Sequence, residues 1–91
     1  MSNYKVILTK QASKYLAKNN RLNSAFKEWK LSLEVNPHIA HDGMLKNEFY
    51  KGLQAYKKRL LVKYRALFVI DDGNLIVEIF KIASRGEVYK D

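Results

Sequence analysis

Residues 64–82 have the sequence YRALFVIDDGNLIVEIFKI, which predicts two adjacent strands. It contains two runs rich in β-branched and aromatic residues, at about 64–71 and 74–82, on either side of the turn sequence DDGN. Runs of this composition predict strands. Gly73 within the turn can adopt a positive φ at little cost, so the two strands are expected to pair as a hairpin.

Further strands are predicted upstream of the hairpin. One covers about residues 54–62 and directly precedes it. A short first strand covers residues 4–8, where Tyr, Val, Ile and Leu occur in an alternating pattern. Four strands are therefore expected, and the segment between the first and second of them must supply the rest of the core.

Two stretches show the three- or four-residue spacing of apolar side chains that is typical of amphipathic helices. The first follows Thr9, whose hydroxyl can accept a hydrogen bond from an unpaired backbone N–H of the next turn, and it ends at residues 19–20. The second ends before Pro37, whose ring disfavours a helical conformation of the preceding residue. The recurring residues are Ala12, Tyr15 and Leu16 in the first stretch and Leu22, Phe26, Trp29 and Leu33 in the second. Together the two stretches predict an αα-hairpin.

The remaining segments lack a clear period. Residues 38–50 are expected to form a loop in which Leu45 and Phe49 contact the core, and residues 83–91 are expected to form a polar tail. The order β-α-α-β-β-β predicts an α+β fold, with a mainly antiparallel sheet and the αα-hairpin packed on one face. A length of 91 residues fits one domain, residues 1–91.

The composition restricts the classes of function. The chain has 17 Lys and Arg against 9 Asp and Glu, and the net charge of +8 suits a polyanion or an acidic protein partner. The sequence has no cysteine, which excludes disulfide and thiolate chemistry. No apolar run approaches the roughly 20 residues that span a bilayer, and the N-terminus lacks an apolar signal core. A cytoplasmic protein without a membrane partner is expected.

Basic residues gather between residues 51 and 65, where no acidic residue occurs. The six are Lys51, Lys57, Lys58, Arg59, Lys63 and Arg65. Basic side chains on a rigid sheet can hold a phosphodiester in a fixed geometry. Successive residues of a strand face opposite sides, so Lys57 and Arg59 are expected to face away from Lys58.

The chain resembles the RelE/ParE superfamily of bacterial toxin–antitoxin modules. The resemblance rests on LTKQASKYLAK after the first strand, NP at the end of the second helix, the hairpin of residues 64–82 and the terminal SRGEVYKD. Its strongest local matches are Tyr64-Arg65 before an apolar strand and Arg85 followed by residues 87–89. The superfamily contains ribosome-dependent mRNA endonucleases, gyrase inhibitors and inactive members.

For a nuclease, the resemblance implies that a ribose 2′-OH attacks its own adjacent phosphate, with no metal or cofactor. Such a reaction needs a base, an acid and positive charge beside the phosphorane. The resemblance places these roles on Lys58, Arg65, Arg85 and Tyr89. Arg65 is expected to stabilise the transition state, because its guanidinium stays charged and can hold two phosphate oxygens. Lys58 can transfer a proton if neighbouring cations lower its pKa, and Tyr89 can transfer a proton or stack on a base.

The resemblance also implies partners. They are a cognate antitoxin, partly acidic, together with the ribosome and its mRNA. The residues expected to bind RNA are Lys51, Lys57, Arg59, Lys63 and Lys81. Two alternatives stay open, because many superfamily members carry a histidine or a further basic residue where this chain has Ala83 and Ser84. They are a ParE-like gyrase inhibitor that acts by protein contacts and a non-catalytic RNA-binding module.

Two other groups of residues are weaker candidates. His38 and His41 lie near Asp42, but they lack a fixed third ligand, so surface loop histidines are favoured over a metal site. Basic residues also recur every three or four positions along the first helix and just beyond it, at Lys10, Lys14, Lys18 and Arg21. Such a face is usually only solvated, although contact with ribosomal RNA or an acidic antitoxin segment is a second interpretation.

Overall fold

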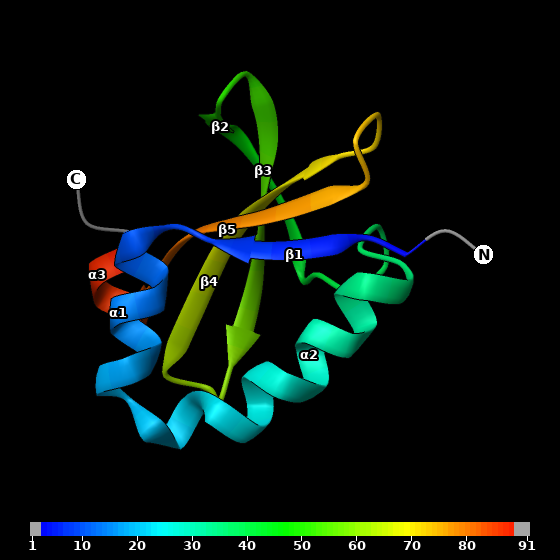
Figure 1. Ribbon diagram of the computed structural model, residues 1–91. Coiled ribbons are helices and arrows are strands. Elements are labelled where there is room, and N and C mark those ends of the chain that lie inside the picture. The colour runs from blue at the N-terminus through cyan, green and yellow to red at the C-terminus, as the bar shows by residue number, and fades with distance from the viewer. Residues whose placement is uncertain (1–2, 89–91) are drawn as a thin grey trace.

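The hairpin predicted from residues 64–82 lies within a five-stranded sheet, with two longer helices on one side (Figure 1). The computed structural model describes the backbone of residues 3–88 and the side chains of residues 3–86. The elements are β1 (Lys5–Leu8), α1 (Lys10–Lys18), a 3-10 turn (Asn20–Leu22), α2 (Asn23–Val35), β2 (Gly43–Tyr50), β3 (Leu53–Leu60), β4 (Tyr64–Asp71), β5 (Ile76–Ser84) and α3 (Arg85–Val88).

The sheet has the strand order β1-β5-β4-β3-β2. β1 pairs with β5 in parallel, and the other three neighbouring pairs are antiparallel. β4 lies in the middle, and its residues 65–70 are all buried, which explains why its sequence is an almost continuous apolar run. The α+β fold with a mainly antiparallel sheet is therefore confirmed.

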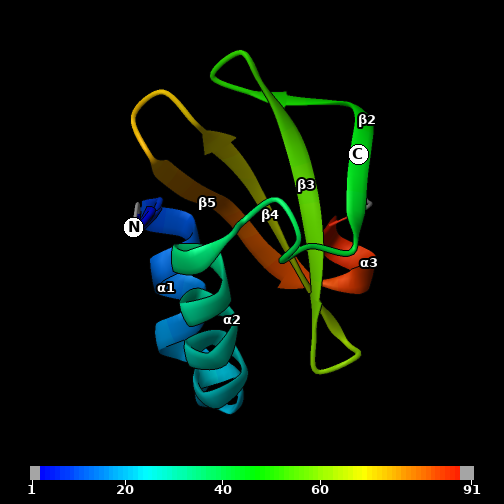
Figure 2. The same ribbon diagram turned by 90° about the vertical axis from the view of Figure 1, so that its right-hand side faces the viewer.

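The core lies between the sheet and the αα-hairpin. Figure 2 shows α1 and α2 on one side of the sheet, with β2 and α3 towards the other side. Trp29 of α2 packs edge-on against Phe68 of β4 at 5.4 Å between ring centroids, and its Nε1 donates a 2.7 Å hydrogen bond to the carbonyl oxygen of Ala40. Leu22 and Leu33 are fully buried beside them. The predicted apolar spacing of the second helix thus identified its core face.

α1 is fixed to β5 at its first turn. Thr9 caps the helix as predicted, since its Oγ1 accepts a hydrogen bond from the backbone N–H of Ala12 at 3.4 Å. The same hydroxyl donates to the carbonyl oxygen of Phe80. Gln11 then pairs with the backbone of Ile82 twice, because its Nε2 donates to the carbonyl and its Oε1 accepts from the N–H.

The loop expected at residues 38–50 is wrong for its second half, where β2 runs from Gly43 to Tyr50. Phe49 is 58% exposed and does not contact the core as expected. β2 is an edge strand, and its pairing with β3 shifts register between Leu45 and Phe49. Backbone hydrogen bonds hold such a strand, so its side chains need not show an apolar period.

Two details at the ends of β5 also differ from expectation. Gly73 does not have a positive φ; Leu75 does, at 55°, and the turn is closed by the carboxylate of Asp71, which accepts hydrogen bonds from the backbone and side chain of Asn74. At the other end, β5 continues to Ser84 and a helical turn, α3, follows where a polar tail was expected. No helix in the described part of the chain is long and apolar enough to cross a bilayer.

Candidate functional site

A basic cleft of about 380 Å³ opens on the sheet face opposite the αα-hairpin. It is lined by Asp42, Lys57, Arg59, Arg65 and Arg85, which are four cations and one carboxylate. The strand register explains how these residues meet. Arg59 of β3 is the cross-strand partner of Arg65 of β4, and directly opposite residues of a sheet project on the same side.

Arg65 occupies the most protected position in the cleft. Its side chain is 8% exposed, and it is the only charged residue in the buried class within the described part of the chain. Its Nη1 donates to the carbonyl oxygens of Val62 at 2.9 Å and Tyr64 at 3.1 Å. Among residues 3–86 no carboxylate forms an ion pair with it. The β3–β4 turn therefore fixes the direction of the guanidinium without neutralising its charge.

Asp42 borders the cleft through contacts with the backbone of β3. Its N–H donates to the carbonyl oxygen of Lys57 at 2.8 Å, and its Oδ2 accepts from the N–H of Arg59 at 2.5 Å. The carboxylate thus binds the main chain of Arg59, and no ion pair joins it to that guanidinium in the described structure. No sequence signal points to this role, because residues 43–50 lack the apolar alternation that would predict a strand beside β3.

Arg85 reaches the cleft from α3. Its backbone N–H donates to the carbonyl oxygen of Lys63 at 2.7 Å, which joins the start of α3 to the β3–β4 turn. Arg65 lies on the strand that leaves this turn. Two segments separated by twenty residues of sequence are thus held together, and both supply a guanidinium to the cleft.

Lys58 lies outside the lining of the basic cleft. Its cross-strand partner is Ala66, which belongs to the core on the helix side of the sheet. The Lys58 Nζ forms a 4.0 Å ion pair with Oδ1 of Asp42, and Lys58 lines a second hollow of about 290 Å³ beside Trp29, which Arg59 also borders. Lys58 is therefore absent from the lining of the basic cleft, as strand alternation predicts for a neighbour of Lys57 and Arg59.

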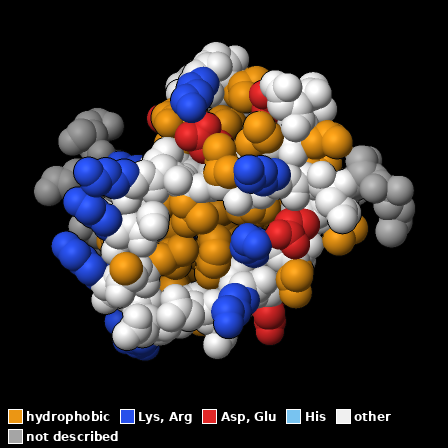
Figure 3. Space-filling model, viewed as in Figure 1, with side chains coloured by type: hydrophobic (Ala, Val, Ile, Leu, Met, Phe, Trp, Pro, Cys, Tyr) orange, Lys and Arg blue, Asp and Glu red, His pale blue; other side chains and the backbone are white. Residues whose placement is uncertain are grey.

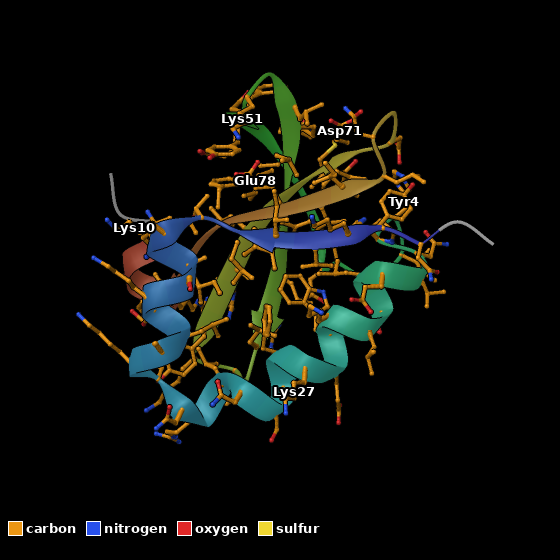
Figure 4. The ribbon with its side chains drawn as sticks, in the orientation of Figure 1. Tyr4, Lys10, Lys27, Lys51, Asp71 and Glu78 are labelled. Carbon is orange, nitrogen blue, oxygen red and sulfur yellow. The ribbon has the colours of Figure 1, made fainter. Side chains whose placement is uncertain are left out.

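The other residues expected to bind RNA lie outside the lining of the cleft. Lys81 shares the side of Lys57, because both are register partners of Leu67. Lys63 is exposed in the β3–β4 turn. Lys51 points toward Glu78 and forms a 3.1 Å ion pair with it (Figure 4), and this hydrogen-bonded carboxylate raises the pKa of Lys51. Tyr89, the fourth expected catalytic residue, lies outside the described residues.

The two histidines have other partners. Nε2 of His38 lies 2.7 Å from Oδ1 of Asp72. Nδ1 of His41 accepts a hydrogen bond from the N–H of Gly43, and its ring packs on Tyr56 at 4.6 Å. Within the described residues, no group of three or more His, Cys, Asp or Glu side chains is placed to hold a metal ion.

Solved structures share this fold over almost the whole chain. The archaeal RelE–RelB complex of Pyrococcus horikoshii OT3 contains a chain with a TM-score of 0.74 and 27% identity, covering 92% of this chain and 97% of that one. The RelBE2 toxin–antitoxin complex of Mycobacterium tuberculosis gives a TM-score of 0.69 and 25% identity, covering 93% and 94%. No protein-family model matches the sequence, and no curated protein matches it at a significant level.

The fold and these likenesses define the class as a small α+β domain of the kind found in toxin–antitoxin complexes. The chain belongs to the RelE/ParE superfamily. The sequence motifs predicted this membership. Two of the motif residues, Arg65 and Arg85, line the basic cleft.

Proposed function

We propose that the protein is the toxin of a toxin–antitoxin module and an endoribonuclease that cleaves mRNA on the ribosome. The observation that carries the proposal is the environment of Arg65. A guanidinium that is 8% exposed, fixed by the carbonyls of Val62 and Tyr64 and without an ion-paired carboxylate among the described residues, faces a cleft lined by three further cations. Holding unneutralised charge in a protected site costs stability, which favours a role in binding a phosphodiester.

The chemistry suits this arrangement of cations. In the proposed step a ribose 2′-OH loses its proton, its oxygen bonds to the adjacent phosphorus, and the P–O5′ bond breaks as the departing oxygen takes up a proton. The products are a 2′,3′-cyclic phosphate and a free 5′-OH. Arg65 and Arg85 stabilise the extra negative charge of the phosphorane, since guanidinium forks bind two phosphate oxygens at once.

Proton transfer is assigned to one lysine of the cleft and to one residue of the C-terminal segment. Lys57 lines the cleft and Lys58 does not, so the role expected for Lys58 passes to Lys57. Tyr89 retains the proton-donor role that the superfamily resemblance implies. Arg59 and Lys81 lie on the same sheet face and bind the flanking phosphates.

The same cleft is the proposed contact for a cognate antitoxin. The two solved neighbours are RelE–RelB and RelBE2 complexes. An acidic segment of a partner chain that enters the cleft would neutralise its cations and exclude RNA, because the two occupants compete for the same guanidinium groups. The antitoxin is therefore expected to be partly acidic and to protect Arg65 from solvent.

The test is induced expression of the protein with primer-extension mapping of transcripts. Wild type should halt translation and leave defined ends within mRNA, and Arg65→Ala should leave transcripts intact. Lys27→Ala removes one exposed cation on α2, outside the cleft, and should behave as wild type. Growth arrest without new mRNA ends would overturn the nuclease proposal.

The ParE-like alternative is favoured by one observation. Ala83 is the register partner of Arg65, and no histidine lines the cleft among the described residues. A cleft with few proton-transfer groups suits a protein that inhibits gyrase by contacts alone. Expression would then induce DNA damage with mRNA intact, so the same experiment separates the two functions. A protein that binds RNA and causes neither effect would be a non-catalytic RNA-binding module.

A further inference from the structure

A second basic surface lies on α1, apart from the cleft. Lys10, Lys14, Lys18 and Arg21 are all exposed, and we refer to these four residues as the α1 ridge. Figure 3 shows Lys and Arg side chains gathered in a column over α1, and Figure 4 shows Lys10 at the start of this helix. The spacing of four residues keeps the three lysines on one face of the helix, spread over about 12 Å of its axis.

No acidic counterpart of the α1 ridge occurs among the described side chains. Residues 1–27 contain six basic residues and no Asp or Glu. Among residues 3–86, no carboxylate forms an ion pair with any member of the ridge. Its charge is therefore not used within the described structure.

This charge pattern works against the stability of the helix. Like charges four residues apart destabilise a helix, and α1 has only nine residues, fewer than the roughly 12 that an isolated helix needs for marginal stability. A single Glu among Lys10, Lys14 and Lys18 would replace repulsion with attraction. The absence of any such residue from α1 indicates that the uniform positive charge has a use outside the fold.

The surroundings of the ridge favour a nucleic-acid backbone over a protein partner. A protein interface has an apolar centre. The other exposed side chains of this segment are small or polar: Gln11, Ser13, Ala17 and Asn20. The large exposed apolar residues Leu31, Val35 and Ile39 lie on α2 and the loop after it. A row of cations with no large exposed apolar side chain beside it is suited to binding the phosphate groups of a nucleic acid.

The surroundings also favour a double helix over a single strand. Sites for single strands combine cations with aromatic side chains on which bases stack. Tyr15, the aromatic residue of α1, is half-buried and packs edge-on against Tyr64 at 6.2 Å. Double-helical RNA is recognised mainly through its shape and its phosphates, which needs no stacking platform.

We propose that the α1 ridge binds the phosphate backbone of double-helical RNA. Its position relative to the cleft supports simultaneous contact with two RNA segments. Gln11, next to Lys10, is hydrogen-bonded to Ile82, three residues before Arg85 of the cleft. The ridge therefore begins beside the end of β5 that leads into the cleft. A double-helical segment of an RNA can bind the ridge while a single-stranded segment of the same RNA enters the cleft.

The experiment measures binding of the purified protein to a blunt RNA duplex by fluorescence anisotropy over a range of KCl concentrations. The ridge variant carries Lys10→Gln, Lys14→Gln and Lys18→Gln. Each lost phosphate contact lowers the slope of log K against log salt by about 0.7 to 0.9, so the slope should fall by about two to three and affinity near 0.15 M salt by roughly 100-fold.

A matched control removes the same charge elsewhere. The control variant carries Lys5→Gln, Lys27→Gln and Lys46→Gln, three exposed positions outside the ridge and the cleft. Its slope should change by less than about one unit. Circular dichroism should show that the ridge variant melts no lower than wild type, because its substitutions remove repulsion.

The proposal is overturned if the ridge and control variants lose the same affinity, since net charge alone would then explain binding. It is also overturned if the ridge variant keeps wild-type affinity for the duplex while losing affinity for poly-glutamate, which would make the ridge a site for acidic protein. Neither result depends on RNA cleavage, so this proposal and the nuclease proposal fail independently.

Discussion

Arg59 and Arg65 are direct cross-strand partners, so two guanidinium-bearing side chains project from neighbouring strands into one cleft. Like charges at directly opposite positions destabilise a sheet, by an amount comparable to the 0.2–1 kcal/mol of a favourable cross-strand pair. The nearby carboxylate of Asp42 does not relieve this repulsion with an ion pair to either guanidinium in the described structure; it accepts the backbone N–H of Arg59. Repulsion between the two guanidinium groups therefore destabilises the sheet locally, and an anion bound between them would remove this repulsion.

Arg59→Gln is therefore expected to reduce function without reducing stability. The free energy of unfolding in urea should stay equal to that of wild type or rise by about 0.5 kcal/mol. Cleavage of mRNA in cells should fall by about 10-fold or more, since one phosphate contact is lost. A variant that unfolds more readily than wild type would show that Arg59 supports the fold through contacts that the register does not explain.

Arg65→Lys tests the geometry of the guanidinium at constant charge. A lysine cannot form the two-pronged contact with phosphate, so cleavage should fall by about 100-fold, as for loss of one transition-state donor. The hydrogen bonds to the carbonyls of Val62 and Tyr64 should be weakened, at a cost of about 1 kcal/mol in unfolding free energy. Lys27→Arg, an exchange at an exposed site, serves as control and should change neither quantity. Wild-type cleavage by Arg65→Lys would contradict the assigned role.

The sequence predicted best those elements whose residues are buried by the fold. β4 and the buried face of α2 appear in the sequence as an apolar run and an apolar stripe. Thr9 was predicted as a cap because its contact is local. β2 was missed for the opposite reason, since an edge strand depends on backbone pairing with β3, and Met44 and Phe49 in it are exposed.

The candidate site was predictable in part. The pairing of Arg59 with Arg65 follows once the β3–β4 register is known, and strand alternation accounts for the absence of Lys58 from the cleft. The fixed position of Arg65 was not predictable, because it depends on the carbonyl of Tyr64 and on that of Val62 in the preceding turn, where Val62 adopts a positive φ of 62°. The entry of Asp42 into the cleft depends on β2, which the sequence did not indicate.

Gln11→Ala tests the connection between α1 and β5. Gln11 satisfies both the carbonyl and the N–H of Ile82, and its removal leaves these partly buried groups without their partner. The free energy of unfolding should fall by about 1–2 kcal/mol. Ser13→Ala, at an exposed position of the same helix, should change it by less than about 0.5 kcal/mol. Equal losses from both substitutions would mean that the contact with β5 adds no stability of its own, since alanine has a higher helix propensity than either residue and cannot cause a loss through propensity.

Asp72 joins three segments that are distant in sequence, and this contact should depend on pH. Its Oδ1 accepts a 2.6 Å hydrogen bond from the Tyr4 hydroxyl and lies 2.7 Å from Nε2 of His38. These hydrogen bonds, chiefly that from Tyr4, lower the pKa of Asp72 below its usual 3.8, and the same carboxylate raises the pKa of Tyr4 above 10.0. A carboxyl whose pKa is lowered in the folded state stabilises the fold above its unfolded pKa, and this contribution is lost as pH falls through the folded value.

Asp72→Asn should therefore lower the melting temperature near pH 7, and this effect should shrink as the pH falls through the folded-state pKa and the wild-type carboxyl takes up a proton. The pKa of Tyr4 is shifted in the opposite direction, so its effect on stability has the opposite pH dependence. The hydrogen bond from Tyr4 stabilises the fold below pH 10.0, and this stabilisation disappears as the pH rises through the folded-state pKa of Tyr4. Tyr4→Phe should accordingly reproduce the loss near neutral pH and converge with wild type in strong alkali. Glu48→Gln, at an exposed site on β2, is the control and should not show this pH dependence. An effect of Asp72→Asn that stays equal from pH 7 down into strong acid would show that the ionised carboxylate is not what joins the three segments.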